Sequence, residues 1–338
     1  MRWSMRATSE TRIVNFISIL AEASESGYVS GQALAKGAKI SRSAVWKQIR
    51  MLRRYGYGID SVHGRGYKLV RRTNLPVPWE LKKILKTSMM GKRIIYRDLV
   101  DSTQGIALAI ANKNSPSDGT VVIAEEQKGG RGRMKRKWIS PSGGLWLSII
   151  VHPDMHPRNM PVLPFAAALA VREAISRVTQ LKVGLKWPND IMISGRKVAG
   201  ILLDISAEAD TINYAIVGIG INANVDPTAI ARSIEDSQEI TSLLAESGLE
   251  VSRLDLAAHV IEQIEKYLEI ARKDGIGAIL TEWKKYADMI GKNATISQGN
   301  KVIHKGIAMD VDSDGSLVLR LANGEKVTVT SGDVRIRY

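Results

Sequence analysis

The sequence of 338 residues contains no cysteine. Disulfide bonds, thiolate metal ligands and a cysteine nucleophile are therefore excluded. The chain also has no apolar run that approaches the roughly 20 residues of a membrane-spanning helix. The apolar stretch from Ile13 to Leu20 is interrupted by Asn15 and Ser18, so it predicts an amphipathic helix rather than a signal peptide. Together these absences favour a cytoplasmic protein with no membrane partner.

Acidic residues are scarce in the first quarter of the chain. Residues 1–75 contain 14 Lys and Arg but only 4 Asp and Glu, whereas the rest of the chain contains 34 and 30. Most of the net charge of +14 therefore belongs to the N-terminal segment. This asymmetry is typical of a nucleic-acid-binding module joined to a nearly neutral body.

The N-terminal segment has the spacing of a helix-turn-helix. Apolar residues recur at helical intervals over 13–20, and a short helix is expected over 30–37, ended by its last glycine. A third helix begins at Ser41 or Ser43 and stops at Gly56. Helix, short turn and helix in this order predict that the third helix is the recognition helix.

The recognition helix and the segment after it would contact DNA. Residues 43–54 form the predicted recognition helix, and residues 59–70 predict two short strands around a glycine-rich basic wing. A solvated basic face without any DNA contact would be enough to explain the charge. The helix order, the glycine turn and the wing together nevertheless favour DNA binding. Residues 71–78, with two prolines close together, predict a linker. The candidate DNA-binding residues are Arg42, Ser43, Lys47, Gln48, Arg50 and Arg65.

The central segment consists mainly of strands in series. Few helices interrupt them, which favours a mixed, mostly antiparallel α+β domain. The run GIGINAN, residues 218–224, lacks the glycine spacing of a dinucleotide-binding fingerprint. The strands are predicted at 119–127, 144–151, 181–193, 197–205 and 213–225, and the helices at 165–178 and 254–271.

The C-terminal segment changes to short strands separated by turn signals. Turns are expected at 298–300, 312–315 and 323–324, and residues 316–321 and 326–331 alternate with period two. This pattern predicts a small β domain.

The loop GGRGRMKRKW, residues 129–138, lies between a strand that ends at Gln127 and a strand that begins near Leu145. Its glycines let the backbone approach a ligand closely. Its arginines match the oxygens of carboxylates and phosphates, and Trp138 offers a flat face to a ring. An RGG-type RNA-binding segment would be longer and repetitive. The position between two strands therefore favours a lid over a phosphorylated small molecule.

Four motifs in the order GRGRMKRKW, KWPNDI, KVAGILLD and GIGINAN resemble those of biotin protein ligases. The basic winged helix in front resembles the class that doubles as a biotin operon repressor, and the resemblance covers essentially the whole chain. It implies a multidomain α+β protein. The domains would be a winged helix-turn-helix over 1–75, a catalytic domain like those of class II synthetases and biotinyl/lipoyl ligases over 76–288, and an SH3-like β-barrel over 289–338.

Members of that family condense biotin with ATP to biotinyl-5′-AMP and then transfer the biotinyl group to one lysine of a biotin carboxyl carrier protein. The resemblance therefore implies ATP, biotin and Mg²⁺ as ligands, and carrier protein and operator DNA as partners. A palindromic operator further implies a homodimer. An anionic carboxylate must attack an anionic phosphate, so the site needs dense positive charge, which Lys186, Arg131 and Arg133 would supply.

The resemblance also assigns binding residues. Gln104 occupies a position where many family members carry asparagine. The biotin-binding residues would be Ser102, Thr103, Gln104, Gln127, Arg131, Gly132, Arg133, Lys186, Gly218 and Gly220. The ATP- or adenylate-binding residues would be Arg133, Trp138, Asn189, Lys197 and Asn222, and Asp190 would bind the metal.

Other interpretations of the same residues remain open. Taken singly, Ser102 and Thr103 could simply cap a helix, and residues 189–190 could form an ordinary polar turn. The chain could be a DNA-binding sensor without turnover, a ligase for another cofactor such as lipoate, or a ligase whose winged helix no longer regulates transcription. The cations Lys186 and Lys197 argue against a sensor, because a sensor need not keep groups that handle ATP.

Overall fold

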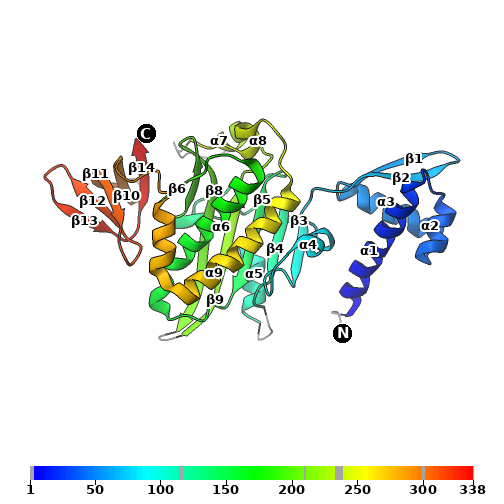
Figure 1. The fold of residues 1–338 in the computed structure, drawn as a ribbon, viewed down its shortest axis with the longest axis horizontal. Helices are drawn as coiled ribbons and strands as arrows, with labels where there is room; N and C mark the ends of the chain where they lie inside the picture. Colours follow the sequence, from blue (N-terminus) through cyan, green and yellow to red (C-terminus); the bar gives the residue numbers. More distant parts are fainter. Residues whose placement is uncertain (1–3, 114–116, 209–210, 233–238, 299–300, 338) are drawn as a thin grey trace. The chain divides into compact units, whose positions relative to one another are not determined.

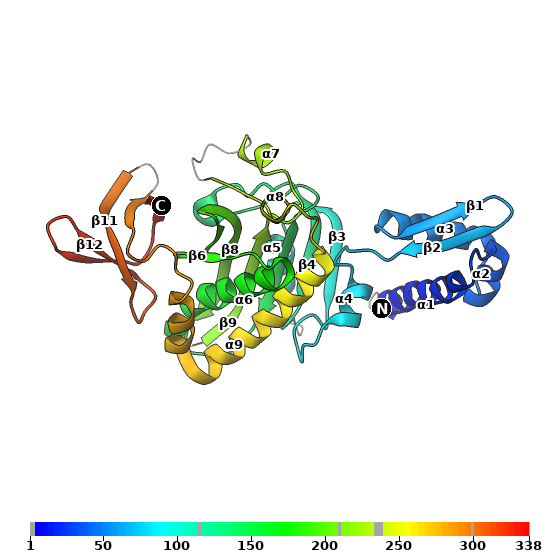
Figure 2. The ribbon, with the colours of Figure 1, turned by 45° about the horizontal axis from the view of Figure 1, so that its top comes forward.

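The computed structural model describes residues 4–113, 117–208, 211–232, 239–298 and 301–337. The chain forms two compact units, Met1–Ile84 and Leu85–Tyr338, which can be followed by colour in Figures 1 and 2. No helix within the described ranges is long and apolar enough to cross a membrane.

The first unit is a winged helix-turn-helix. Ser30 and Ser41 are the N-caps of the second and third helices, so the recognition helix begins directly after Ser41. Apolar residues at helical spacing on the three helices form its core: Phe16, Ile17, Leu20, Leu34, Val45, Ile49 and Leu52. Its elements are α1 (Ser4–Glu25), α2 (Gly31–Ala38), α3 (Arg42–Arg54), the antiparallel pair β1 (Gly58–Val62) and β2 (Gly66–Arg71), and α4 (Pro78–Ile84).

Gly37 does not end α2, contrary to the sequence-based prediction. The helix continues to Ala38, and Lys39 adopts the left-handed C-cap conformation with φ 52°. A Cβ at Gly37 would lie 3.2 Å from Cγ2 of Ile19. The absence of a side chain at this position therefore serves the close packing of α2 against α1.

The segment predicted as a linker is packed into the first unit. Val77 and Leu81 are fully buried, and Pro78 is the first residue of α4, where a missing N–H is tolerated. The carboxylate of Glu80 accepts hydrogen bonds from the Tyr57 hydroxyl and from Arg72. The prediction was wrong because the two prolines were weighed without the apolar residues that follow them.

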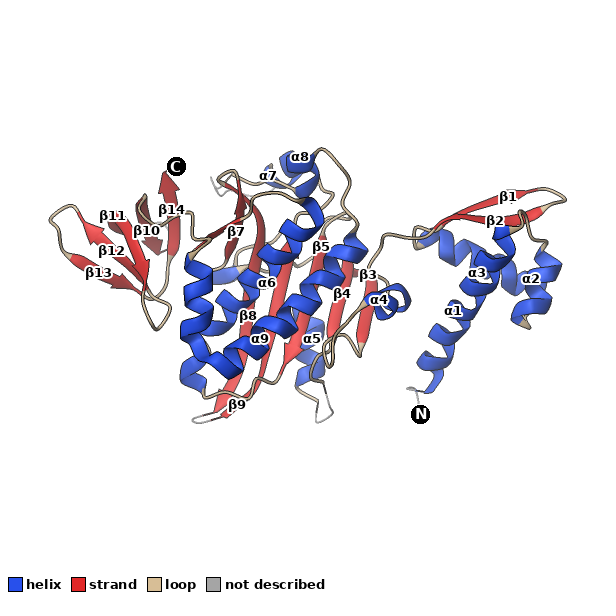
Figure 3. Cartoon of the chain, in the orientation of Figure 1, coloured by secondary structure: helices blue, strands red, loops and turns tan. Residues whose placement is uncertain are grey.

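The second unit is built on a mixed sheet. Over the described residues seven strands form it in the order β3-β4-β5-β9-β8-β7-β6. The β3–β4 pair is parallel and the other neighbours are antiparallel, so the predicted mostly antiparallel sheet is confirmed (Figure 3). The strands are β3 (Ile94–Val100), β4 (Val121–Gln127), β5 (Leu145–Val151), β6 (Gly184–Lys186), β7 (Asp190–Ile193), β8 (Arg196–Glu208) and β9 (Thr211–Ile221).

Two long helices cover one face of this sheet and pack side by side (Figures 1 and 3). They are α6 (Val162–Thr179) and α9 (Arg253–Lys284), and α9 passes through one non-helical residue, Gly275 with φ 78°. The helix α5 (Thr103–Ala111) packs against β4, β5 and β9. Short helical turns complete the unit: Arg133–Lys135, Pro157–Asn159, α7 (Pro227–Ala231) and α8 (Leu243–Ser247).

The C-terminal β domain is antiparallel, and in the part of the chain described its five strands follow the order β13-β12-β11-β10-β14. Gly315 and Gly324 have positive φ in the predicted turns 312–315 and 323–324, whereas the predicted turn 298–300 lies mostly outside the described residues. The indole of Trp187 donates to the Gly315 carbonyl at 2.8 Å and joins this domain to the large sheet. The strands are β10 (Asn293–Gln298), β11 (Lys301–Val311), β12 (Leu317–Leu321), β13 (Lys326–Val329) and β14 (Asp333–Arg337).

Candidate active site

A cavity of about 1310 Å³ opens over glycine positions in the middle of the large sheet. Gly218 and Gly220 on β9 face the same side because strand side chains alternate, and Gly200 on β8 is paired with Gly220. A Cβ at Gly220 would lie 2.5 Å from Nε1 of Trp138, and a Cβ at Gly200 would lie 3.0 Å from its Cζ3. The glycines therefore let the Trp138 indole lie directly against the strands.

Two buried polar atoms at this end of the cavity lack a hydrogen-bond partner within the described residues. They are Nε1 of Trp138 and Oδ1 of Asn222. The Nδ2 of Asn222 donates to the Thr241 carbonyl at 3.0 Å, which fixes the amide with its oxygen unpaired. The ammonium of Lys197 lies 5.3 Å from the Trp138 ring centroid. Buried polar groups are rarely left unpaired. An unpaired donor and an unpaired acceptor in the lining of one cavity therefore indicate a ligand that carries both kinds of group.

A buried polar network forms the other end. The Thr103 N–H donates to Oε1 of Gln127 at 2.8 Å, and the Thr103 hydroxyl lies 2.9 Å from that of Ser148. Ser148 donates to Oε1 of Gln104 at 2.9 Å, and Nε2 of Gln104 donates to the Ile216 carbonyl at 3.1 Å. Ser102 stands at the N-cap of α5, but its side chain makes no capping hydrogen bond. The expected cap by the Ser102 hydroxyl is therefore absent, and its buried side chain lines the cavity instead.

Three cations also line the cavity: Lys186, Lys197 and Arg133. Lys186 is the last residue of β6, and its ammonium lies 3.4 Å from Oδ2 of Asp190, while Lys197 lies 2.6 Å from Oδ1 of the same carboxylate. Arg133 donates to Oδ1 of Asn189 at 2.9 Å. Burial lowers the pKa of the Arg133 guanidinium, an effect that the charge of Asp190 opposes. Partly desolvated cations of this kind favour an anionic ligand.

The residues present do not fit the metal site expected at Asp190. Each oxygen of its carboxylate contacts a lysine ammonium, and the described residues contain no group of three or more His, Asp or Glu that could hold a metal ion. Asp190 instead fixes the positions of two lysines that line the cavity.

The basic loop folds back over the cavity. The backbone N–H of Gly132 donates to the Arg136 carbonyl at 2.8 Å, and the backbone N–H of Trp138 donates to the Gly130 carbonyl at 2.9 Å. The Arg136 side chain forms an ion pair with Asp333 on β14, whereas the Arg131 side chain is exposed. The loop is thus a compact turn between two strands whose far end contacts the C-terminal β domain.

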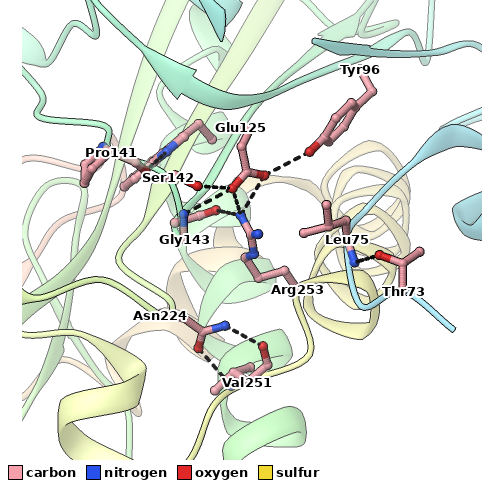
Figure 4. Close-up of polar contacts among 12 residues, drawn as sticks. Thr73, Leu75, Tyr96, Glu125, Pro141, Ser142, Gly143, Asn224, Val251 and Arg253 are labelled. Carbon is pink, nitrogen blue, oxygen red and sulfur yellow. Dashed lines mark hydrogen bonds and ion pairs between the residues drawn. The ribbon is translucent and has the colours of Figure 1, made fainter. Parts of the chain in front are cut away.

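All of the biotin- and ATP-site residues predicted from the sequence line this one cavity. A feature that the sequence analysis missed is the support of the loop by Glu125 on β4 and Arg253 on α9 (Figure 4). Nothing in the sequence links these two residues, because they lie 128 positions apart.

In the first unit the predicted DNA-contacting side chains lie on α3 and the wing. All are exposed except Gln48, which is half-buried. The sequence analysis missed Trp46 on α3, whose side chain is 54% exposed with the Arg50 guanidinium 5.5 Å from its ring centroid. The sequence could have indicated this exposure, because Trp46 lies outside the apolar stripe of α3 formed by Val45, Ile49 and Leu52. Arg42, Ser43, Trp46, Arg50 and Arg65 line one groove.

Family models match three segments of the chain and define its class. An HTH domain covers residues 16–68, the Biotin/lipoate A/B protein ligase family covers 96–222, and the Biotin protein ligase C terminal domain covers 289–337. In sequence order, the protein therefore consists of a helix-turn-helix domain, a ligase-type domain and a small C-terminal domain.

Known proteins with similar sequences narrow this class. The chain is 36% identical over 310 residues to the bifunctional ligase/repressor BirA of Bacillus subtilis, covering 91% of this chain and 94% of that protein. It is 31% identical to BirA of Escherichia coli, covering 86% and 87%. The biotin protein ligase of Aquifex aeolicus, solved in complex with biotin and ATP, is 28% identical with a TM-score of 0.62, covering 73% of this chain and 99% of that one. The chain belongs to the biotin protein ligase family.

Proposed function

We propose that this protein is a biotin–[biotin carboxyl carrier protein] ligase that also acts as a biotin-responsive transcriptional repressor. The observation that supports the ligase most strongly is that a buried polar network, a glycine floor and a cluster of cations all line the same cavity. Its two ends differ in chemistry, as a site for two different substrates requires. The cytoplasmic location remains a prediction.

The polar network would bind the ring end of biotin. Thr103, Gln104 and Gln127 offer fixed donors and acceptors, and Ser102, Arg131 and Gly132 complete this side of the cavity. Lys186, whose buried ammonium also lines the cavity, would bind the biotin carboxylate.

The Trp138 end would bind the nucleotide. The unpaired indole N–H and the unpaired Asn222 oxygen suit an adenine edge, which carries both an acceptor and a donor. Lys197, Asn189 and Arg133 would then face the phosphates. Mg²⁺ would enter with the ATP phosphates, since the protein builds no site for it at Asp190.

In the first reaction a carboxylate oxygen of biotin attacks the α-phosphorus of ATP, and pyrophosphate leaves. Negative charge gathers around the α-phosphate in the transition state, so preorganised cations such as Lys186 and Arg133 lower the barrier. In the second reaction the amine of a carrier lysine attacks the carbonyl carbon of the mixed anhydride, and AMP leaves.

The test is an incubation of the protein with labelled ATP and biotin, with and without a biotin carboxyl carrier protein. We expect biotinyl-5′-AMP without the carrier and a biotinylated lysine with it. A tightly bound ligand without any turnover would identify a sensor instead, and equal activity with lipoate in place of biotin would contradict the substrate assignment.

Gly218→Ala should raise the KM for biotin roughly tenfold, because misplacing a binding group by a fraction of an ångström is costly. A Cβ at this position would lie 2.5 Å from Oε1 of Gln104, whose amide is held on both sides by hydrogen bonds. Steady-state kinetics with varied biotin measures the effect, and the KM for ATP should not change. Gly277→Ala is the matched control, since a Cβ there meets nothing within 4 Å. An unchanged KM for biotin in Gly218→Ala would remove Gln104 from the biotin end.

The repressor half of the proposal rests on the first unit. A winged helix that reads a palindrome binds as a two-fold dimer with one recognition helix per half-site. Adenylate bound under the basic loop could complete a dimer surface. The adenylate would then act as corepressor, because it would bind the dimer-forming state of the protein more tightly than the other state. DNA affinity should then be tighter with biotin and ATP present than without them.

Two substitutions on α3 separate kinds of DNA contact. Arg50→Ala should weaken DNA binding and leave adenylation intact, because Arg50 lies in the first unit and the cavity lies in the second. Trp46→Ala should weaken binding about tenfold, the scale of one base-edge contact, without changing the salt dependence, since tryptophan carries no charge. Binding of a fragment from upstream of the gene, measured at several salt concentrations, gives both quantities. Wild-type affinity in both variants would contradict the placement of α3 on DNA.

A further inference from the structure

The segment that follows the basic loop is attached to β4 by alternate side chains. Gln127 donates to the Ser140 hydroxyl at 2.9 Å. Two residues earlier, Glu125 accepts hydrogen bonds from the Ser142 hydroxyl and from the Gly143 N–H (Figure 4). We call residues 140–144 the return segment.

The Glu125 carboxylate is held in place by groups from two other elements. Arg253, the first residue of α9, lies 2.9 and 3.0 Å from its two oxygens and also donates to the Gly144 carbonyl at 3.0 Å. The Tyr96 hydroxyl donates to the same carboxylate at 2.9 Å, and burial raises the Tyr96 pKa, so this donor keeps its proton. Arg253 itself is 7% exposed. The ion pair is thus mostly buried, and both of its members make further hydrogen bonds.

The return segment is connected in turn to the wall of the cavity. The Trp146 indole donates to the Pro141 carbonyl at 2.9 Å, and its ring packs edge-on against Trp138 with the centroids 6.4 Å apart. The Ser140 hydroxyl donates to the Trp138 carbonyl at 3.1 Å. Both the backbone and the ring of Trp138 are therefore supported by the segment that Glu125 and Arg253 hold.

We propose that Glu125 and Arg253 are positioning residues for the nucleotide. Neither lines the cavity; they fix the return segment, and the return segment fixes Trp138. The inference rests on the proposed function, which places ATP against Trp138. The biotin end meets the return segment only through Gln127, which accepts from Thr103 and donates to Ser140. The contacts of Gln104 and Ser148 go to α5, β5 and β9 instead. Weakening this ion pair should therefore affect ATP more strongly than biotin.

Glu125→Gln keeps the shape of the side chain and removes its charge. We expect the KM for ATP to rise roughly tenfold, the scale of a small misplacement in a binding site, with a clearly smaller change in the KM for biotin. Glu265→Gln is the matched control. The Glu265 carboxylate also accepts several hydrogen bonds, from the backbone at Ser88, Met89 and Met90, but supports no part of the loop. It should leave both KM values unchanged.

Two further measurements separate positioning from a general loss of stability. Arg253→Lys should recover part of the ATP affinity that Arg253→Gln loses. Hydrogen exchange of the Gly143 amide, measured without substrates, should accelerate in Glu125→Gln and stay slow in Glu265→Gln. Should Glu125→Gln fail to fold, Ser142→Ala removes one of the same hydrogen bonds and should show a smaller change in the same direction.

Equal shifts of both KM values, or an unchanged KM for ATP, would overturn the proposal. A wild-type protein that forms no adenylate would overturn the proposed function instead. The exchange of the Gly143 amide would still report whether Glu125 holds the return segment.

Discussion

Lys186→Ala should slow the formation of biotinyl-5′-AMP by about 10²–10³-fold, the scale for loss of one preorganised donor to a transition state. The Lys186 side chain is almost fully buried, and Asp190 orients its ammonium at 3.4 Å. It lines the same cavity as the network that would bind biotin, and it shares the Asp190 carboxylate with Lys197, which would face the phosphates. Its loss removes positive charge where two anions must meet.

Rapid quenching of a single turnover with labelled ATP measures this step directly. Lys182→Ala is the control, because Lys182 is exposed and precedes the same strand. Wild-type adenylation in Lys186→Ala would remove Lys186 from its assigned role, and equal slowing in both variants would indicate a general effect of charge.

Arg133→Gly should release the adenylate roughly 10–100-fold faster, the range for loss of a hydrogen bond from a charged group. Arg133 donates to Oδ1 of Asn189 at 2.9 Å and so closes the basic loop across the cavity. Without this contact the loop excludes water less well and retains the intermediate less tightly. The released mixed anhydride acylates amines nearby without selection.

Biotinylation of lysines on a bystander protein, measured by blotting with labelled streptavidin, reports this release. Arg158→Gly, at an exposed arginine outside the loop, is the control. Slow release from Arg133→Gly, with no rise in bystander labelling, would show that the loop is not a lid.

Local patterns predicted the strands that the sheet requires. The apolar runs predicted as strands at 119–127 and 144–151 became β4 and β5, and the helix predicted at residues 165–178 became most of α6. The run 181–193 became a hairpin of two short strands, β6 and β7, because the chain reverses direction in a turn at residues 187–189. Elements with weak local signals, such as β3 and α4, were missed, since tertiary packing rather than their own pattern stabilises them.

The candidate site likewise contains residues that the sequence predicted and contacts that it could not predict. Motif resemblance selected Lys186, Lys197 and Trp138, and the fold brings them to one cavity. The double contact of Asp190 with two lysines could not be predicted, because it depends on the register of β7 against β6 and β8. The pairing of Glu125 with Arg253 depends on where α9 begins relative to β4, and no short-range pattern contains that information.

The central claim is that this cavity joins biotin to the α-phosphate of ATP. Exchange of labelled pyrophosphate into ATP tests it most directly, because exchange requires a reversibly formed adenylate. The account predicts exchange that depends on added biotin, persists without carrier protein and falls sharply in Lys186→Ala. No exchange with biotin present, or exchange at the same rate without it, would contradict the account.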